Sequence, residues 1–116
     1  MDINITKYDD FSVVELVGDV DLSCSPDART QILKVLNNET DLAVNLEKVT
    51  YIDSSGIASL VEGYQIAKKK QLSFALVSAS PAVMSVLTLA RLDMVFPMFA
   101  NLEEYKANQS ALKNRR

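Results

Sequence analysis

Histidine is absent from the 116-residue sequence, and cysteine occurs once, at Cys24. Without histidine the chain lacks the most common general base, the usual activator of a nucleophilic serine or cysteine, and the most common metal ligand. The lone cysteine cannot form an intramolecular disulfide, which fits a reducing compartment. We therefore expect a protein that is not an enzyme and binds no cofactor or metal.

Long apolar runs are also missing. No stretch approaches the roughly 20 apolar residues that span a bilayer. The N-terminus has no basic start followed by an apolar segment, so it does not resemble a signal peptide. The net charge of −3 disfavours nucleic acid as a partner, because binding to phosphates needs a basic surface. These features predict a cytoplasmic protein that binds neither nucleic acid nor membranes.

Glycine and proline are scarce, with three of each, and no linker, repeat or low-complexity tract interrupts the chain. A length of 116 residues suits one hydrophobic core. We predict a single domain over residues 1–116 that ends in a disordered basic tail at residues 113–116.

The N-terminal part predicts two strands. Ile3 and Ile5 alternate with polar residues, which indicates a short strand with one exposed face. The denser apolar run from Phe11 to Val17 indicates a more central strand, and residues 18–21 (Gly-Asp-Val-Asp) predict a polar turn after it.

The rest of the chain alternates helices with strands. Ser25-Pro26 and Ser80-Pro81 predict two helix starts, since serine can cap exposed amides and proline suits the first helical position. Further strands are predicted at residues 42–46, 72–76 and 94–96, and a last helix opens at Glu103 and Glu104. The order ββαβαβαβα predicts an α/β fold, with a mixed, mostly parallel sheet of about five strands covered by about four helices.

The segment Asp53-Ser54-Ser55-Gly56 lies between a predicted strand and an amphipathic helix. The first turn of a helix exposes unpaired N–H groups and the positive end of the helix dipole, so a phosphate added there would find donors. Gly56 keeps the turn open to a partner, because it has no side chain. The alternative is that Ser54 or Ser55 only caps the helix.

The helix that follows has its apolar residues on one face, at Ile57, Leu60, Val61 and Tyr64. Gly63 lies within it, at a cost of about 1 kcal/mol relative to alanine. Packing against a close neighbour would account for this glycine.

Asp19 and Asp21 follow the preceding strand and could lie at the same end of the sheet, which would bring Asp21 near Ser54. An apolar strand followed by Asp-x-Asp is also found in aspartyl-phosphate phosphatases, but here only Lys48 and Asp53 could complete such a site. A serine hydrolase is still less suitable, because Ser54 lacks a G-x-S-x-G context and a histidine. We interpret Cys24 as a half-buried small apolar residue.

With these segments in view, the sequence resembles the STAS-domain family, and within it the bacterial anti-sigma factor antagonists (anti-anti-sigma factors). The resemblance covers nearly the whole chain. It rests on residues 18–21, Ser25-Pro26, residues 42–46, the central motif Val49-Thr50-Tyr51-Ile52-Asp53-Ser54-Ser55-Gly56-Ile57, and residues 76–83 and 89–92.

The resemblance implies a phosphorylation cycle at Ser54, with Ser55 as the alternate acceptor. A histidine-kinase-like serine kinase that is also the anti-sigma factor would phosphorylate the chain, and a PP2C-type phosphatase would reset it. The unphosphorylated form would bind the kinase and release the sigma factor. The implied partner-binding residues are Asp21, Ser23, Asp53, Ser55, Gly56 and Ile57.

A second interpretation stays open. The stretch from Ile57 to Gly63 also resembles STAS proteins found beside lipid-transport or multi-domain regulatory systems. In that case the chain would be a scaffold subunit, for instance of a membrane-lipid ABC transporter, and Ser54 would not be phosphorylated. For either interpretation we expect a monomer or a weak dimer.

Overall fold

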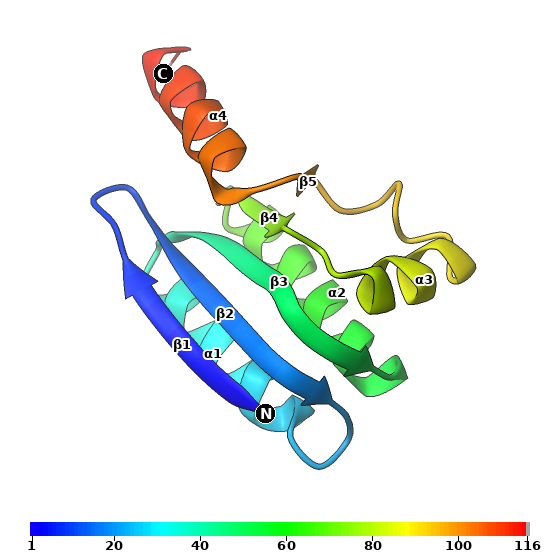
Figure 1. The fold of residues 1–116 in the computed structure, drawn as a ribbon. Coiled ribbons are helices and arrows are strands. Elements are labelled where there is room, and N and C mark those ends of the chain that lie inside the picture. The colour runs from blue at the N-terminus through cyan, green and yellow to red at the C-terminus, as the bar shows by residue number, and fades with distance from the viewer. Residues whose placement is uncertain (116) are drawn as a thin grey trace.

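A computed structural model describes the backbone of residues 1–115 and the side chains of residues 1–111. The elements are β1 (Asp2–Lys7), β2 (Phe11–Val20), α1 (Ser25–Asn37), β3 (Asp41–Ile52), α2 (Ser54–Lys69), β4 (Phe74–Val77), α3 (Pro81–Leu89), β5 (Met98–Phe99) and α4 (Leu102–Arg115). They follow one another in the predicted order (Figure 1).

The strands form one sheet in the order β1-β2-β3-β4-β5. Strand β1 pairs with β2 in the antiparallel sense, and the three other pairings are parallel. The predicted fold class is therefore confirmed: over the described residues the protein is α/β, with a mixed, mostly parallel five-stranded sheet and four helices.

Both faces of the sheet carry apolar side chains, because successive strand residues point to opposite sides. On one face, Val14 and Leu16 of β2 belong to a large core with helices α1, α2 and α3. On the other face, Phe11 and Val13 pack in a smaller core with Tyr105 of α4. All four residues of β4 are buried, which fits a central parallel strand covered on both sides.

The predicted polar turn at residues 18–21 is wrong. Strand β2 continues to Val20, which pairs with Ile52 and is buried in the core. The pairing between β2 and β3 continues through two register shifts, and Gly18 adopts a φ of 93° that favours glycine. The local polarity predicted a turn, but these residues instead continue β2 because they pair with the long strand β3.

Two local predictions need correction. Cys24 precedes α1 without a side-chain cap, and Ser25 is a buried first helical residue rather than the cap. The short edge strand lies at Met98–Phe99 and not at residues 94–96, because the Pro97 carbonyl accepts the first hydrogen bond, from the Leu76 amide at 3.0 Å. The predicted cap at Ser80 is confirmed, since its hydroxyl accepts from the Val83 amide at 3.3 Å.

Gly63 has the close neighbours that we predicted. A Cβ atom at this position would lie 2.8 Å from Cγ2 of Ile32 and 3.0 Å from Cε2 of Phe74. Helix α4 continues to Arg115, and Arg116 lies outside the described residues. Disorder of the tail 113–116 therefore stays a prediction.

Candidate functional site

The candidate site lies at the edge of the sheet where β2 and β3 end. These strands are parallel, so their carboxyl ends are neighbours, and the Asp53 amide donates to the Val20 carbonyl at 3.1 Å. The loop after β2, which contains Asp21, therefore lies beside the start of α2, as the topology predicts. Asp21 and Asp53 are close enough for their carboxylates to repel each other.

Asp53 is the N-cap of α2. Its Oδ1 atom accepts hydrogen bonds from the Ser55 amide at 2.9 Å, the Gly56 amide at 3.1 Å and the Ser55 hydroxyl at 2.6 Å. This corrects the alternative in which Ser54 or Ser55 caps the helix, because the cap is a carboxylate, which suits the positive end of the helix dipole.

Ser54 is the first residue of α2, and its side chain is exposed to solvent. Ser55 is half-buried, and its hydroxyl proton is engaged by Asp53. Of the two serines, only Ser54 therefore presents its hydroxyl to an approaching enzyme without first breaking a bond to the cap.

The donors that we expected for a phosphate are already occupied. The Asp53 side chain accepts hydrogen bonds from the amides of Ser55 and Gly56. Its backbone carbonyl accepts from the Ile57 amide at 3.1 Å. A phosphate on Ser54 would have to displace Asp53 to reach these amides. If Asp53 stays in place, the phosphate remains exposed to solvent near the carboxylates.

Hydrogen bonds lower the pKa of both carboxylates. The Ser55 hydroxyl lowers the pKa of Asp53 below its ordinary value of 3.8, aided by backbone amides that include that of Leu22. The Ser23 hydroxyl and amide lower the pKa of Asp21 in the same way, although the negative charge of Asp53 acts in the opposite direction. Asp53, which directly precedes Ser54, and its neighbour Asp21 are therefore both negatively charged at neutral pH.

Gly56 does not keep the turn open, contrary to our prediction. It is buried, and a Cβ atom there would lie 2.7 Å from Cγ1 of Ile52 and 2.9 Å from Cγ1 of Val20. The glycine lets α2 approach the sheet, which positions the helix start. Ile57 is only 7% exposed and belongs to the core. Gly56 and Ile57 are therefore buried residues that hold the start of α2 against the sheet, and they do not form the exposed surface of the site.

The residues considered for phosphatase chemistry are not directed into one site. Asp19 accepts from the Thr50 hydroxyl at 2.7 Å, and Lys48 is paired with Glu15 at 3.7 Å on the sheet. Cys24 is half-buried, and its thiol donates to the Asp19 carbonyl. Among the described residues, no group of three potential metal ligands comes together. Within this part of the chain, no helix is both long enough and apolar enough to cross a bilayer.

The family model of the STAS domain matches residues 2–105. The chain belongs to the STAS domain family. The resemblance noted from the sequence is thus confirmed. Of the curated proteins, an anti-sigma-B factor antagonist from Bacillus subtilis is 21% identical over 103 residues, covering 89% of this chain and 94% of the relative.

Solved structures share the fold of this STAS domain. An anti-sigma factor antagonist from Mycobacterium paratuberculosis superposes with a TM-score of 0.81 at 24% identity, covering 92% of each chain. The antagonist SpoIIAA in its unphosphorylated form gives 0.80 at 19% identity, covering 95% of this chain and 97% of SpoIIAA. The phosphorylated form of the Bacillus SpoIIAA gives 0.71 at 19% identity, covering 99% of this chain and all of SpoIIAA.

Two exposed apolar side chains beside the STAS-domain site were not predicted. Leu22, in the loop after β2, is 72% exposed, and its backbone amide helps to lower the pKa of Asp53. Tyr51, at the end of β3, is 51% exposed and pairs with Asp19. A leucine between Asp21 and Ser23 in a polar loop was the available signal, since an apolar side chain there has no core to enter.

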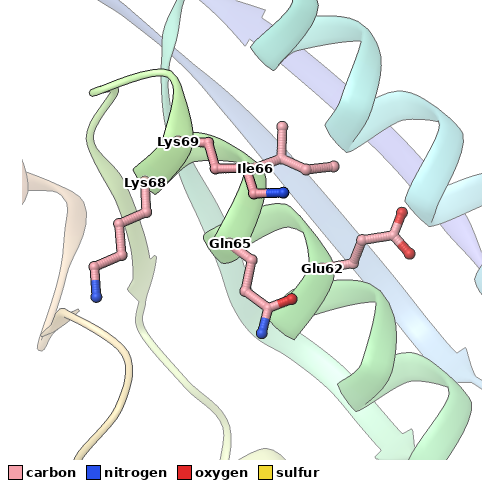
Figure 2. Close-up of a pocket in the computed structure, with 5 residues that line it drawn as sticks. All are labelled: Glu62, Gln65, Ile66, Lys68 and Lys69. Carbon is pink, nitrogen blue, oxygen red and sulfur yellow. The ribbon is translucent and has the colours of Figure 1, made fainter.

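A surface groove of about 670 Å³ runs along the second half of α2, lined by Glu62, Gln65, Ile66, Lys68 and Lys69 (Figure 2). Ser54 lies at the other end of the same helix. The groove therefore takes no part in the candidate site. Lys68 and Lys69 are exposed in the last turn, where positive charge complements the helix dipole.

Proposed function

We propose that this STAS domain is an anti-sigma factor antagonist that binds a serine kinase and is switched off by phosphorylation of Ser54. The observation that carries the proposal is the exposed Ser54 hydroxyl on a helix start whose amides are occupied by Asp53. Because Asp53 caps the helix, α2 does not need Ser54 for its stability. The hydroxyl is free to serve as a phosphate acceptor.

Two relatives support the proposal that the chain is an antagonist controlled by phosphorylation. The Bacillus subtilis relative is named as an anti-sigma-B factor antagonist, and SpoIIAA, which shares the fold, has been solved in a phosphorylated form. By analogy, the partner is a histidine-kinase-like serine kinase that is also the anti-sigma factor, and a PP2C-type phosphatase removes the phosphate. In this cycle the chain is a substrate and a binding partner in the cytoplasm, not an enzyme.

The switch works through charge. A phosphoserine adds about −1.5 to −2 charges at neutral pH. Ser54 directly follows Asp53, whose carboxylate interacts with that of Asp21, so phosphorylation would make this acidic surface strongly acidic. A partner surface that suits two carboxylates then meets an excess of negative charge and a bulkier group. We expect its affinity to fall about tenfold or more, without a rearrangement of the sheet or helices.

The test begins with affinity capture from the native cell, using wild-type protein, Ser54→Ala and Ser55→Ala as matched baits. Mass spectrometry identifies captured kinases, and intact-mass measurement after incubation with the captured kinase and ATP counts the phosphates added. We expect one phosphate on the wild type and on Ser55→Ala, and none on Ser54→Ala. Phosphate retained by Ser54→Ala and lost from Ser55→Ala would move the acceptor to Ser55.

Calorimetry with the same kinase tests the charge mechanism. Ser54→Asp should bind at least several-fold more weakly than Ser54→Asn, because these two side chains are nearly the same size and differ in charge. Equal affinities would contradict an electrostatic switch. Capture of transporter ATPase subunits by all three baits, with no phosphate on any, would favour the scaffold interpretation instead.

A further inference from the structure

Strand β1 forms a free edge of the sheet. Among the residues that the structure describes, it pairs with β2 alone, and Figure 1 shows no element on its outer side. Its six residues pair continuously with Ser12–Val17, without a bulge. Natural edge strands are usually protected by proline, bulges or charges in their middle. β1 has charges only at its ends, Asp2 and Lys7, and the four residues between them are uncharged.

The backbone groups that face outward can be deduced from the hairpin. The Tyr8 amide donates to the Phe11 carbonyl at 2.8 Å, which makes this a hydrogen-bonded pair. Hydrogen-bonded and non-hydrogen-bonded pairs alternate along an antiparallel ladder. Thr6, Asn4 and Asp2 therefore direct their backbone groups toward β2. Ile3, Ile5 and Lys7 direct theirs toward the free edge.

These three outward-facing residues are symmetric about Ile5. We propose that the free edge of β1 binds β1 of a second copy of this chain, antiparallel and centred on Ile5, to form a continuous ten-stranded sheet. Ile5 then pairs with the partner's Ile5, and Ile3 pairs with the partner's Lys7. All three residues exchange backbone hydrogen bonds. Paired residues share a face of the sheet, so α1, α2 and α3 of both copies lie on one side and α4 of both copies on the other.

Charge and burial favour this arrangement. Asp2 and Lys7 stand at opposite ends of β1, so the antiparallel register keeps the like charges of the two copies apart and places Lys7 opposite the partner's Ile3. A parallel arrangement would bring like charges together. Ile5 is 40% exposed and lines a groove beside α1 together with Val35, and the partner's Ile5 would cover it. This contact is small, so we expect a dimer that dissociates on dilution.

Cysteine pairs test the arrangement, because Cys24 is the one native cysteine and Cys24→Ser supplies a cysteine-free background. In the proposed register, Asn4 faces the partner's Thr6 as a non-hydrogen-bonded pair, with Cα atoms about 4.5 Å apart, within disulfide range. Asn4 and the partner's Asn4 are offset by two residues, about 7 Å along the strand, which is too far. The same holds for Thr6 and the partner's Thr6.

We therefore expect a disulfide-linked dimer when Asn4→Cys and Thr6→Cys chains are mixed under mild oxidation, and none with either variant alone. Cross-linking of Asn4→Cys with itself would overturn the alignment on Ile5. In sedimentation experiments on wild-type protein, the average mass should rise above that of one chain with concentration. Ile5→Lys should abolish the rise, and Met94→Lys, which changes another exposed apolar residue, should not. A constant mass up to millimolar concentration, without cross-linking, would overturn the proposal.

Discussion

The hydroxyl of Ser55 donates to the carboxylate of Asp53 at 2.6 Å, so one serine of the pair supports the helix cap while its neighbour Ser54 remains exposed. This division of roles explains how two adjacent serines can differ in function. The bond also contributes most to lowering the pKa of Asp53 below its ordinary value.

We expect Ser55→Ala to raise the pKa of Asp53 toward its ordinary value of 3.8, because the variant lacks the hydroxyl donor. A carboxyl group with a lowered folded-state pKa stabilises the fold above its unfolded-state pKa, and this contribution is lost as the pH falls through the lower value. The variant should therefore lose less stability between neutral pH and acid below about pH 4. Carboxyl-detected NMR titration measures the shift, and Ser54→Ala, which leaves the cap intact, should show none.

Gly63→Ala should destabilise the protein, although alanine favours a helix by about 1 kcal/mol over glycine. The added Cβ atom would lie within 3.0 Å of Ile32 and Phe74, and such overpacking costs about 1–3 kcal/mol. Denaturant unfolding measures the net change. Ala58→Gly, at an exposed position of the same helix, isolates the propensity effect. A Gly63→Ala variant more stable than the wild type would contradict the packing role.

Tyr105 should govern part of the stability at high pH. Burial raises its pKa to about 12, against the hydrogen bond with Ser73, which acts in the opposite direction. A tyrosine with a raised folded-state pKa contributes stability that is fully present below the unfolded value of 10 and declines as the pH rises from 10 toward 12. Urea unfolding at several alkaline pH values should show this decline in the wild type. The decline should be smaller in Tyr105→Phe.

Leu22 and Tyr51 should contribute to affinity for the captured kinase, because exposed apolar side chains beside a charged centre supply burial in an interface. We expect Leu22→Ala and Tyr51→Ala each to weaken binding roughly tenfold. Tyr8→Ala is the matched control, since Tyr8 is exposed in the hairpin at the opposite end of the sheet. Calorimetry gives the affinities. Unchanged binding of both site variants would place the interface elsewhere.

The order of elements was predictable from the sequence because apolar periodicity changes between strands and helices at each boundary. The ends of elements were less predictable. Residues 18–20 are polar enough for a turn, yet they complete β2, because β3 offers a partner up to Ile52. The position of β5 was also not predictable from local sequence. It is set by the backbone of β4, whose Leu76 amide donates to the Pro97 carbonyl and thereby aligns Met98 and Phe99 with β4.

The candidate site was predictable in its location but not in its internal bonds. The Asp-Ser-Ser-Gly motif indicated a helix start, and two successive parallel strands indicated a shared sheet edge. Which residue caps the helix depended on the direction of the Asp53 side chain. Gly56 was misinterpreted because its neighbours, Val20 and Ile52, come from two strands far from each other in the sequence.

The sequence by itself determined the alternation of strands and helices, the lack of histidine chemistry and the presence of two serines at a helix start, because these follow from residue type and local periodicity. Only the tertiary structure decided that Ser54 is exposed while Ser55 is engaged, that Leu22 and Tyr51 border the site, and that β1 has a free edge. The positions of Leu22 and Tyr51 and the free edge depend on contacts between segments distant in the chain, which local sequence does not record. The engagement of Ser55 depends on the direction of the neighbouring Asp53 side chain, which residue type alone does not specify.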